Sequence, residues 1–118
     1  MPNTEEHIRK YKENKKLLET NLNIENCDFY NWVVTVSFYA ALHLVEAKLS
    51  ESGIDSKDHF ARSNNVERFN QFKNIRTQYK TLYDKSRIAR YDAAFMNKKK
   101  GQFALKCLKQ IEEEIKIS

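Results

Sequence analysis

The sequence predicts an all-α fold, an antiparallel bundle of four to five helices. Only 2 Gly and 1 Pro occur among the 118 residues, so the residues that an all-β domain needs at its turns are nearly absent. The strong helix formers Lys, Glu, Leu, Ala, Gln and Arg are abundant instead. Aromatic residues make up 12% of the chain, which is enough to fill a core. We therefore expect residues 1–118 to form a single helical domain.

The first helix is predicted to begin at Asn3 or Thr4 and to end near Leu22. Asn3 is followed three residues later by Glu6, a spacing that resembles a capping box. The opposite face of this amphipathic helix is charged, and we expect His7 to be exposed there. The stripe that faces the core comprises Ile8, Tyr11, Lys15, Leu18 and Leu22.

The second helix is predicted to begin near the N-cap candidate Asp28 and to continue to about Ser52, where Gly53 closes it. Residues 32–45 read WVVTVSFYAALHLV, an apolar run of 14 residues. A bilayer span needs about 20 apolar residues. This run therefore favours the central helix of the bundle over a membrane segment.

Two features inside this central helix concern packing and function. Small Ala40 and Ala41 stand among large neighbours, so another helix or a second copy of the chain can approach closely. His43 lies between Leu42 and Leu44. A hydrogen-bonded core histidine is favoured there over a functional one.

The loop GIDSKD precedes the third helix, which Ser56 or Asp58 can cap. Residues 59–72 are predicted to be helical, with a break or bend at Asn64 and Asn65. A stronger helix follows over residues 73–92. Its candidate core residues are Ile75, Tyr79, Leu82, Ile88 and Ala89.

The last helix is predicted from about Gln102 to Ile115, after a short connector with the sequence FMNKKKG. Its apolar stripe comprises Phe103, Leu108, Ile111 and Ile115.

Charge is distributed unevenly along the chain. Residues 1–58 hold 7 Lys and Arg against 10 Asp and Glu, a net charge of −3, whereas residues 59–118 hold 14 against 6, a net charge of +8. This asymmetry favours a polyanionic partner for the second half, either RNA or a nucleotide. Basic residues that only keep a small protein soluble are the alternative.

Most familiar catalytic and metal-binding patterns are absent from the sequence. Two glycines are too few for a glycine-rich phosphate loop, and there is no His-Glu-x-x-His, Cys-x-x-Cys or nucleophile elbow. Cys27 and Cys107 have no ligand-like spacing. We expect no metal site and no cofactor, and two reduced cysteines in a cytoplasmic protein.

The segment KSRIARYDAAF, residues 85–95, holds the strongest candidate binding residues. Arg87 and Arg90 are one helical turn apart, and guanidinium groups bind phosphate in a bidentate manner. Tyr91 is available to stack on a base. His59 and Arg62 are also three residues apart on one helix and form a second candidate pair, for which a cap or surface role is equally favoured.

Three segments, taken in order, resemble the HEPN (higher eukaryotes and prokaryotes nucleotide-binding) domain family. YNWVVTVSFYAALHLVEAKLSESG resembles the long central helix of the family. DSKDHFARSNNV is similar to the His-containing start of its third helix. LYDKSRIARYDAAF resembles the late stretch with arginine and tyrosine before the last helix. The likeness covers roughly residues 28–115, and its specificity lies in the combination.

The resemblance implies a helical bundle that often dimerises through its central helices. It also implies a place among ribonucleases of toxin–antitoxin and defence systems, or among noncatalytic partners of nucleotidyltransferases. Ribonuclease members carry an Arg followed by His after four to six residues in a late helix. No Arg in this chain is followed by His at that distance, because the last histidine is His59.

Three hypotheses follow. The leading one is a HEPN-like domain that binds RNA or a nucleotide without catalysis, through Arg62, Arg87, Arg90 and Tyr91, in a toxin–antitoxin or defence setting. It would form a homodimer through the central helix and could serve a nucleotidyltransferase or an antitoxin. The second is a metal-independent ribonuclease that uses His59 with Arg87 and Arg90. The third is a protein-interaction subunit that binds no nucleic acid.

Overall fold

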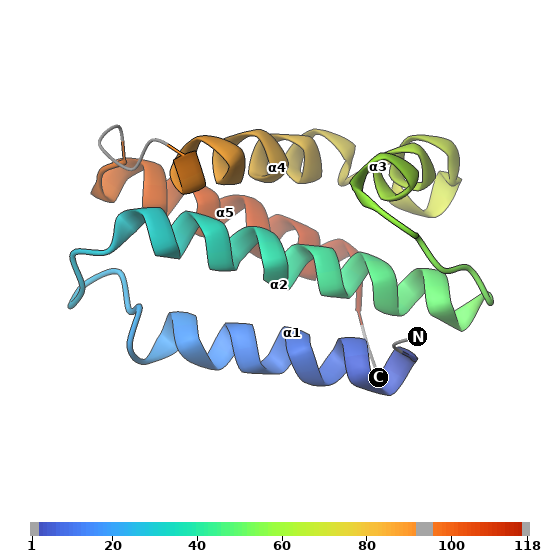
Figure 1. Cartoon of the computed structure of the whole chain (residues 1–118), viewed down its shortest axis with the longest axis horizontal. Coiled ribbons are helices and arrows are strands. Elements are labelled where there is room, and N and C mark those ends of the chain that lie inside the picture. Colours follow the sequence, from blue (N-terminus) through green and yellow to red (C-terminus); the bar gives the residue numbers. More distant parts are fainter. Residues whose placement is uncertain (1–2, 92–95, 117–118) are drawn as a thin grey trace.

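The computed structural model describes residues 3–91 and 96–116, and these residues contain helices and no strand. Long helices that follow one another along the chain, α1 with α2, α2 with α4 and α4 with α5, run antiparallel, whereas α2 and α5 run in the same direction (Figure 1). The molecule measures 39 × 25 × 23 Å. The predicted all-α bundle is therefore confirmed. Its elements are α1 (Thr4–Glu19), α2 (Tyr30–Glu51), α3 (His59–Arg68), the 3-10 helix η1 (Asn70–Phe72), α4 (Arg76–Tyr91) and α5 (Lys98–Glu114).

Helix α2 lies at the centre of the bundle and packs against α1, α4 and α5 (Figure 1). Ala40 and Ala41 are fully buried, so these small residues serve close packing within the chain. By length and hydropathy α2 is long and apolar enough to cross a membrane, but 78% of its most apolar window is buried inside the bundle. Burial of this kind is what a central core helix shows.

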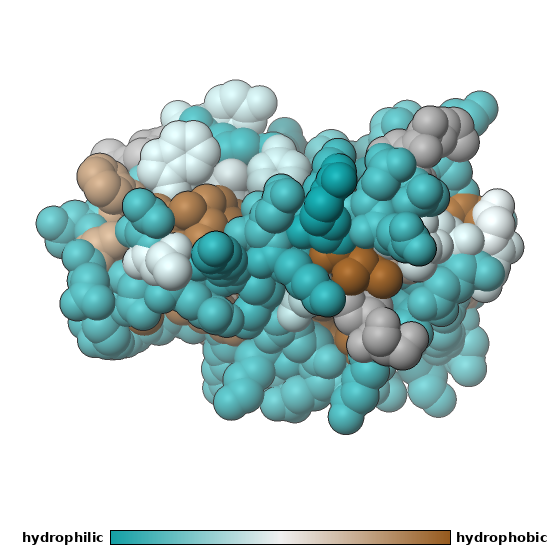
Figure 2. Space-filling view, turned by 90° about the horizontal axis from the view of Figure 1, so that it is seen from below, coloured by the Kyte–Doolittle hydropathy of each residue, from teal (hydrophilic) through white to brown (hydrophobic). Residues whose placement is uncertain are grey.

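Helix α1 is capped as predicted, since the Asn3 side chain accepts a hydrogen bond of 2.9 Å from the backbone N–H of Glu6. Glu112 of α5 fixes α1 in place. It accepts a hydrogen bond from the hydroxyl of Tyr11 and forms an ion pair with Lys15, at 3.1 Å. The surface viewed from the α1 side is mostly hydrophilic with small hydrophobic areas (Figure 2), as an amphipathic surface helix requires.

The prediction that His7 is exposed is wrong. Only 6% of His7 is exposed, and its Nδ1 lies 3.1 Å from Nδ1 of His43 on α2. His7 precedes Tyr11 by four residues and Leu18 by eleven, so it extends the stripe that faces α2. Beside it, the Thr4 and Ser50 hydroxyls are 2.5 Å apart. The start of α1 is thus held to α2 by polar side chains.

Side-chain hydrogen bonds near the helix ends decide where α3 and α5 begin and whether α3 bends. Asp58 caps α3 as expected, through a 2.8 Å hydrogen bond from the backbone N–H of Ala61. Asn65 does not break this helix, because its side chain donates to the Ser56 hydroxyl at 3.0 Å. Helix α5 begins four residues earlier than predicted, since Asn97 caps it.

Two predicted core residues lie at the surface instead. Ile88 is 48% exposed and Phe103 is 44% exposed. The buried face of α4 follows Tyr79, Leu82, Ser86 and Ala89, and Ile88 points away from it. In α5 the buried face follows small Gly101 and Ala104, which bring the helix close to its neighbours and leave Phe103 outside.

Candidate functional site

His59 occupies the first position of α3 and faces the space between α2 and α4. Its ring centroid lies 5.2 Å from that of Tyr83 on α4 and 5.8 Å from that of Phe38 on α2. Phe38 and Tyr83 also contact each other, at 5.6 Å between centroids. Because Asp58 caps α3, the start of this helix and the orientation of His59 are fixed.

A nearly buried ion pair between Arg62 of α3 and Glu46 of α2 lies next to His59, on the side toward the core. Nε of Arg62 donates to Oε1 of Glu46 at 2.6 Å, and the two side chains are 11% and 3% exposed. Nη1 of the same guanidinium lies 3.0 Å from Nδ1 of His59. Arg62 therefore connects a carboxylate inside α2 to the imidazole at the start of α3. Its charge is neutralised by Glu46 instead of facing solvent.

This contact determines which nitrogen of His59 carries the proton. A guanidinium group only donates hydrogen bonds, so Nδ1 of His59 accepts. Burial lowers the pKa of His59, and the charges of Arg62 and Arg90 lower it further, against an opposing effect of Asp58. The neutral imidazole is therefore favoured at neutral pH, with its proton on Nε2. In this state His59 is a hydrogen-bond donor.

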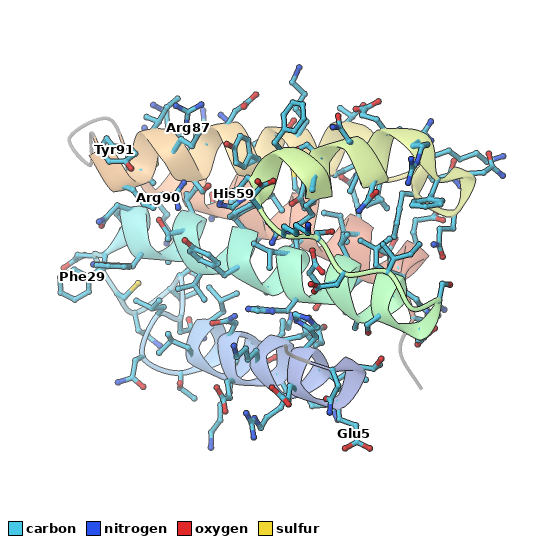
Figure 3. The ribbon with its side chains drawn as sticks, turned by 45° about the vertical axis from the view of Figure 1, so that its right-hand side comes forward. Glu5, Phe29, His59, Arg87, Arg90 and Tyr91 are labelled. Carbon is cyan, nitrogen blue, oxygen red and sulfur yellow. The ribbon has the colours of Figure 1, made fainter. Side chains whose placement is uncertain are left out.

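Arg87 and Arg90 lie near the end of α4, on the same side of the molecule as His59 (Figure 3). Arg90 donates from Nη1 to the hydroxyl of Tyr39 at 2.9 Å. The guanidinium carbon of Arg87 lies 5.9 Å from the ring centroid of Tyr83. Neither arginine forms an ion pair with a carboxylate in the described part of the chain. Both guanidinium groups are thus exposed and held by tyrosine rings.

The structure brings three of the predicted residues together and gives two others different surroundings. His59, Arg87 and Arg90 converge around Tyr83 and Tyr39, and we call these five side chains the tyrosine–arginine cluster. Arg62 supports the cluster from behind. Tyr91 is 83% exposed and lines a shallow groove on α4.

The other residues of this groove are Asp84, Arg87 and Ile88. Asp92, the second carboxylate next to the arginines in the sequence, lies outside the described residues. Within the described ranges 3–91 and 96–116, no three His, Cys, Asp or Glu side chains gather where they could hold a metal ion. The chemistry offered by the cluster is hydrogen-bond donation, positive charge and aromatic surface.

Sequence reasoning missed three residues of this arrangement, Glu46, Tyr39 and Tyr83. Glu46 had a usable signal, because a carboxylate directly after the most apolar run of the chain requires a buried positive partner. Tyr83 stands four residues before Arg87 on the same helical face, which also predicts contact. Nothing in the local sequence indicated that Tyr39 would meet Arg90, 51 residues later.

Comparison with models of known protein families gives a match over nearly the whole chain. A family model described as HEPN domain matches residues 4–118. No curated protein and no solved structure matches the chain significantly. The matched range contains every helix described above.

Proposed function

The chain belongs to the HEPN domain family, and from this premise we propose that it binds RNA or a nucleotide at the tyrosine–arginine cluster without cleaving it. The observation that carries the proposal is the convergence of three helices there. His59 comes from α3, Tyr39 from α2, and Arg87 with Arg90 from α4. Two guanidinium groups that form no ion pair within the described ranges can neutralise phosphate, and exposed Tyr91 offers a ring for stacking.

The state of His59 supports binding over catalysis. General acid–base catalysis requires a group that both takes up and releases a proton. The Nδ1 lone pair of His59 is engaged by Arg62, and a second positive charge there would face that guanidinium. Its Nε2–H is a fixed donor, suited to hold a phosphate oxygen. The neutral donor and the two arginines together complement an anion.

Salt dependence of RNA binding tests the proposal. Each phosphate contact on a single strand contributes about 0.7 to the slope of log K against log salt. For an Arg87→Gln/Arg90→Gln variant we expect a slope shallower by about 1.4 and at least about tenfold weaker binding at low salt. Fluorescence anisotropy with a labelled single-stranded oligoribonucleotide measures both quantities.

The matched control is Arg9→Gln/Lys12→Gln, which removes two positive charges from exposed positions on α1, at the far side of α2. This control should leave the slope within about 0.3 of the unsubstituted protein. If the Arg87/Arg90 variant keeps the full slope while remaining helical by circular dichroism, phosphate is not bound at the cluster.

A divergent ribonuclease is the second candidate, because His59 and both arginines do lie together. We expect no cleavage of single-stranded or structured RNA during prolonged incubation with micromolar protein. Cleavage that His59→Ala abolishes and His7→Ala retains would replace the binding proposal with this one. Gel analysis of the RNA ends would then show whether 2′,3′-cyclic phosphates form, as expected for attack by the 2′-hydroxyl.

Self-association through the central helix remains a prediction. The surface that α2 can offer is limited, because most of its side chains are buried within the chain. Trp32 is 54% exposed near its start, and Tyr39 is partly buried in the cluster. Analytical ultracentrifugation of the protein and of a Trp32→Ala variant tests whether this edge is used. A nucleotidyltransferase or antitoxin partner, and a toxin–antitoxin or defence role, stay proposals of the same kind.

A further inference from the structure

A pocket between α3 and α4 lies beside the tyrosine–arginine cluster and is not used by the proposed phosphate site. It has a volume of about 240 Å³. Helix α3 contributes Ser63, Val66 and Glu67 to its lining. Helix α4 contributes Arg76, Tyr79, Lys80, Tyr83 and Asp84. Two helices therefore enclose it, with side chains of several chemical kinds.

The inner wall of the pocket is apolar and aromatic. Val66 and Tyr79 are each 2% exposed, and Tyr83 is partly buried. Tyr83 is therefore the ring in this wall that a nucleobase could stack on, with Val66 and Tyr79 packed behind it. The buried hydroxyl of Tyr79 has no hydrogen-bond partner among the described residues. The wall is thus suited to a flat ring.

The polar rim of the pocket carries two carboxylates, together with the ammonium group of Lys80 and the hydroxyl of Ser63. Glu67 and Asp84 are exposed carboxylates, and neither forms an ion pair within the residues that the structure describes. Arg76 is occupied, since Nε donates to the carbonyl of Val66 at 2.9 Å and Nη2 to that of Phe69 at 3.2 Å. The two carboxylates offer acceptors to N–H donors, and the charges of Arg76 and Lys80 balance theirs.

The pocket is continuous with the residues that would hold phosphate. Tyr83 lines it and also contacts both His59 and Arg87. Asp84 lines it and also lines the groove of Arg87, Ile88 and Tyr91. Along α4, the carboxylate of Asp84 is therefore followed within one helical turn by the guanidinium group of Arg87.

We propose that this pocket holds the base of a bound nucleotide and selects bases that carry an exocyclic amino group, through Glu67 and Asp84. The inference rests on the proposed function, because the phosphate of the same nucleotide would lie on Arg87 and Arg90. Cytosine and guanine present amino hydrogens to the two carboxylates. Uracil presents a carbonyl oxygen at the position where cytosine has its amino group, so it would face a carboxylate and be rejected.

Two pairs of oligoribonucleotides with equal length and charge test the proposal. Oligocytidine differs from oligouridine at the N4 amino group, and guanosine differs from inosine only in the 2-amino group. We expect the amino-bearing member of each pair to bind about tenfold more tightly, as one or two hydrogen bonds to a charged acceptor predict. Competition against one labelled strand at fixed salt gives the ratios.

Isosteric variants assign the preference to the pocket. Glu67→Gln and Asp84→Asn should each reduce the cytosine-to-uracil ratio by about threefold or more, because an amide donates as well as accepts. The salt slope should stay unchanged, since no phosphate contact is removed. Glu5→Gln on α1, far from the pocket in Figure 3, is the matched control and should keep the full ratio.

The outcomes separate this inference from the function on which it rests. Equal affinities within both pairs, with a normal salt slope that Arg87→Gln/Arg90→Gln weakens, overturn the pocket and leave phosphate binding intact. A preference that survives in both carboxylate variants also overturns it. Absence of binding to every oligonucleotide, at low salt, overturns the inference together with the proposed function.

Discussion

At the scale of single residues, Glu46 and Arg62 show how a charged group is accommodated in the core. The Glu46 side chain is 3% exposed, and its partner Arg62 is 11% exposed. Removal of both charges from water is costly, and a close hydrogen-bonded contact of 2.6 Å offsets that cost. The same guanidinium fixes the tautomer of His59. One ion pair therefore supports both the packing of α3 and the orientation of His59.

Glu46→Gln should lower the stability of the fold strongly. The substitution leaves the Arg62 guanidinium buried without its counter-charge, and loss of one partner of a buried pair costs about 3 kcal/mol or more. Urea denaturation followed by circular dichroism measures the change. Glu51→Gln removes one partner of the exposed Lys48–Glu51 pair at the end of the same helix, and it should change stability by less than about 0.5 kcal/mol.

A double variant tests whether the stability of this region depends on the balance of the two charges or on the packing of the two side chains. In Glu46→Leu/Arg62→Met both charges are absent, so no unpaired ion remains in the core. We expect this protein to be more stable than Glu46→Gln. If the two proteins unfold at the same urea concentration, the stability of this region does not depend on charge compensation.

At the scale of secondary structure, the two glycines of the chain have different reasons to be there. Gly53 follows α2 with φ of +74°. The backbone N–H of Gly53 donates to the carbonyl of Ser50, and that of Ile54 to the carbonyl of Leu49, both at 3.0 Å. These two hydrogen bonds form a Schellman motif, which needs a left-handed residue at this position. Gly101 lies inside α5 with ordinary helical φ, and there its lack of a side chain lets Ile24 pack closely against the helix.

Gly53→Ala should therefore destabilise the protein by about 1 kcal/mol, because alanine is strained at positive φ. Gly101→Ala is the matched comparison. Its new methyl group would lie 2.9 Å from Cδ1 of Ile24, the flexible end of a side chain, and alanine gains about 0.8 kcal/mol of helix propensity. We expect Gly101→Ala to be near neutral. Thermal unfolding measures both variants, and an equal loss in the two would contradict the φ argument.

The helices themselves could be predicted from periodicity and composition, whereas their ends and rotations could not in every case. Asn3 and Asp58 cap their helices as predicted because capping is a local interaction. Ile88 was misplaced because the buried face of α4 depends on where α2 and α5 lie, which local sequence does not contain. The burial of His7 was present in the local pattern, because it shares a helical face with the predicted core residues Tyr11 and Leu18, but its partner His43, 36 residues away, was not.

At the scale of the whole molecule, positive charge is more concentrated on the side of the bundle formed by α4 and α5 than on the side formed by α1. Most of the acidic excess of the first half lies in its loops, since α1 holds 5 Lys and Arg against 4 Glu; α4 holds 5 Lys and Arg against 1 Asp, and α5 holds 5 Lys against 3 Glu. Helix α2 is central: α1 covers one of its sides, and α4 and α5 cover the opposite side (Figure 1). A polyanion approaching the protein is therefore favoured on the α4–α5 side.

Of the candidate site, the sequence singled out several side chains that lie together, but not the contacts that hold them. His59, Arg87 and Arg90 were predicted as a group and do converge, because the order of helices places the start of α3 beside α4. The role of Arg62 required the structure, since only the fold shows that Glu46 lies within reach of its guanidinium. The pocket lined by Glu67 and Asp84 is likewise formed by two helices whose packing angle no local pattern specifies.

The whole fold should lose stability when the pH falls below neutral, because of the histidine pair between α1 and α2. Burial, with smaller effects of His7, Lys10 and Arg62, lowers the pKa of His43 to about 4. Burial also lowers the pKa of His7, which Glu46 and Asp55 partly oppose. In the unfolded chain both rings titrate near pH 6.5, so the unfolded state binds more protons below that value.

The sign follows from linkage: stability that is fully present above pH 6.5 is lost as the pH falls toward 4. After allowance for the partial exposure of His43, we expect a loss on the order of 1–2 kcal/mol between pH 7.5 and pH 4.5, measured by urea denaturation at each pH. His43→Gln should flatten this part of the profile. His59→Gln removes the histidine of the cluster and should retain most of the loss. An unchanged profile in His43→Gln would show that acid acts elsewhere in the bundle and that the contact between α1 and α2 does not set its pH dependence.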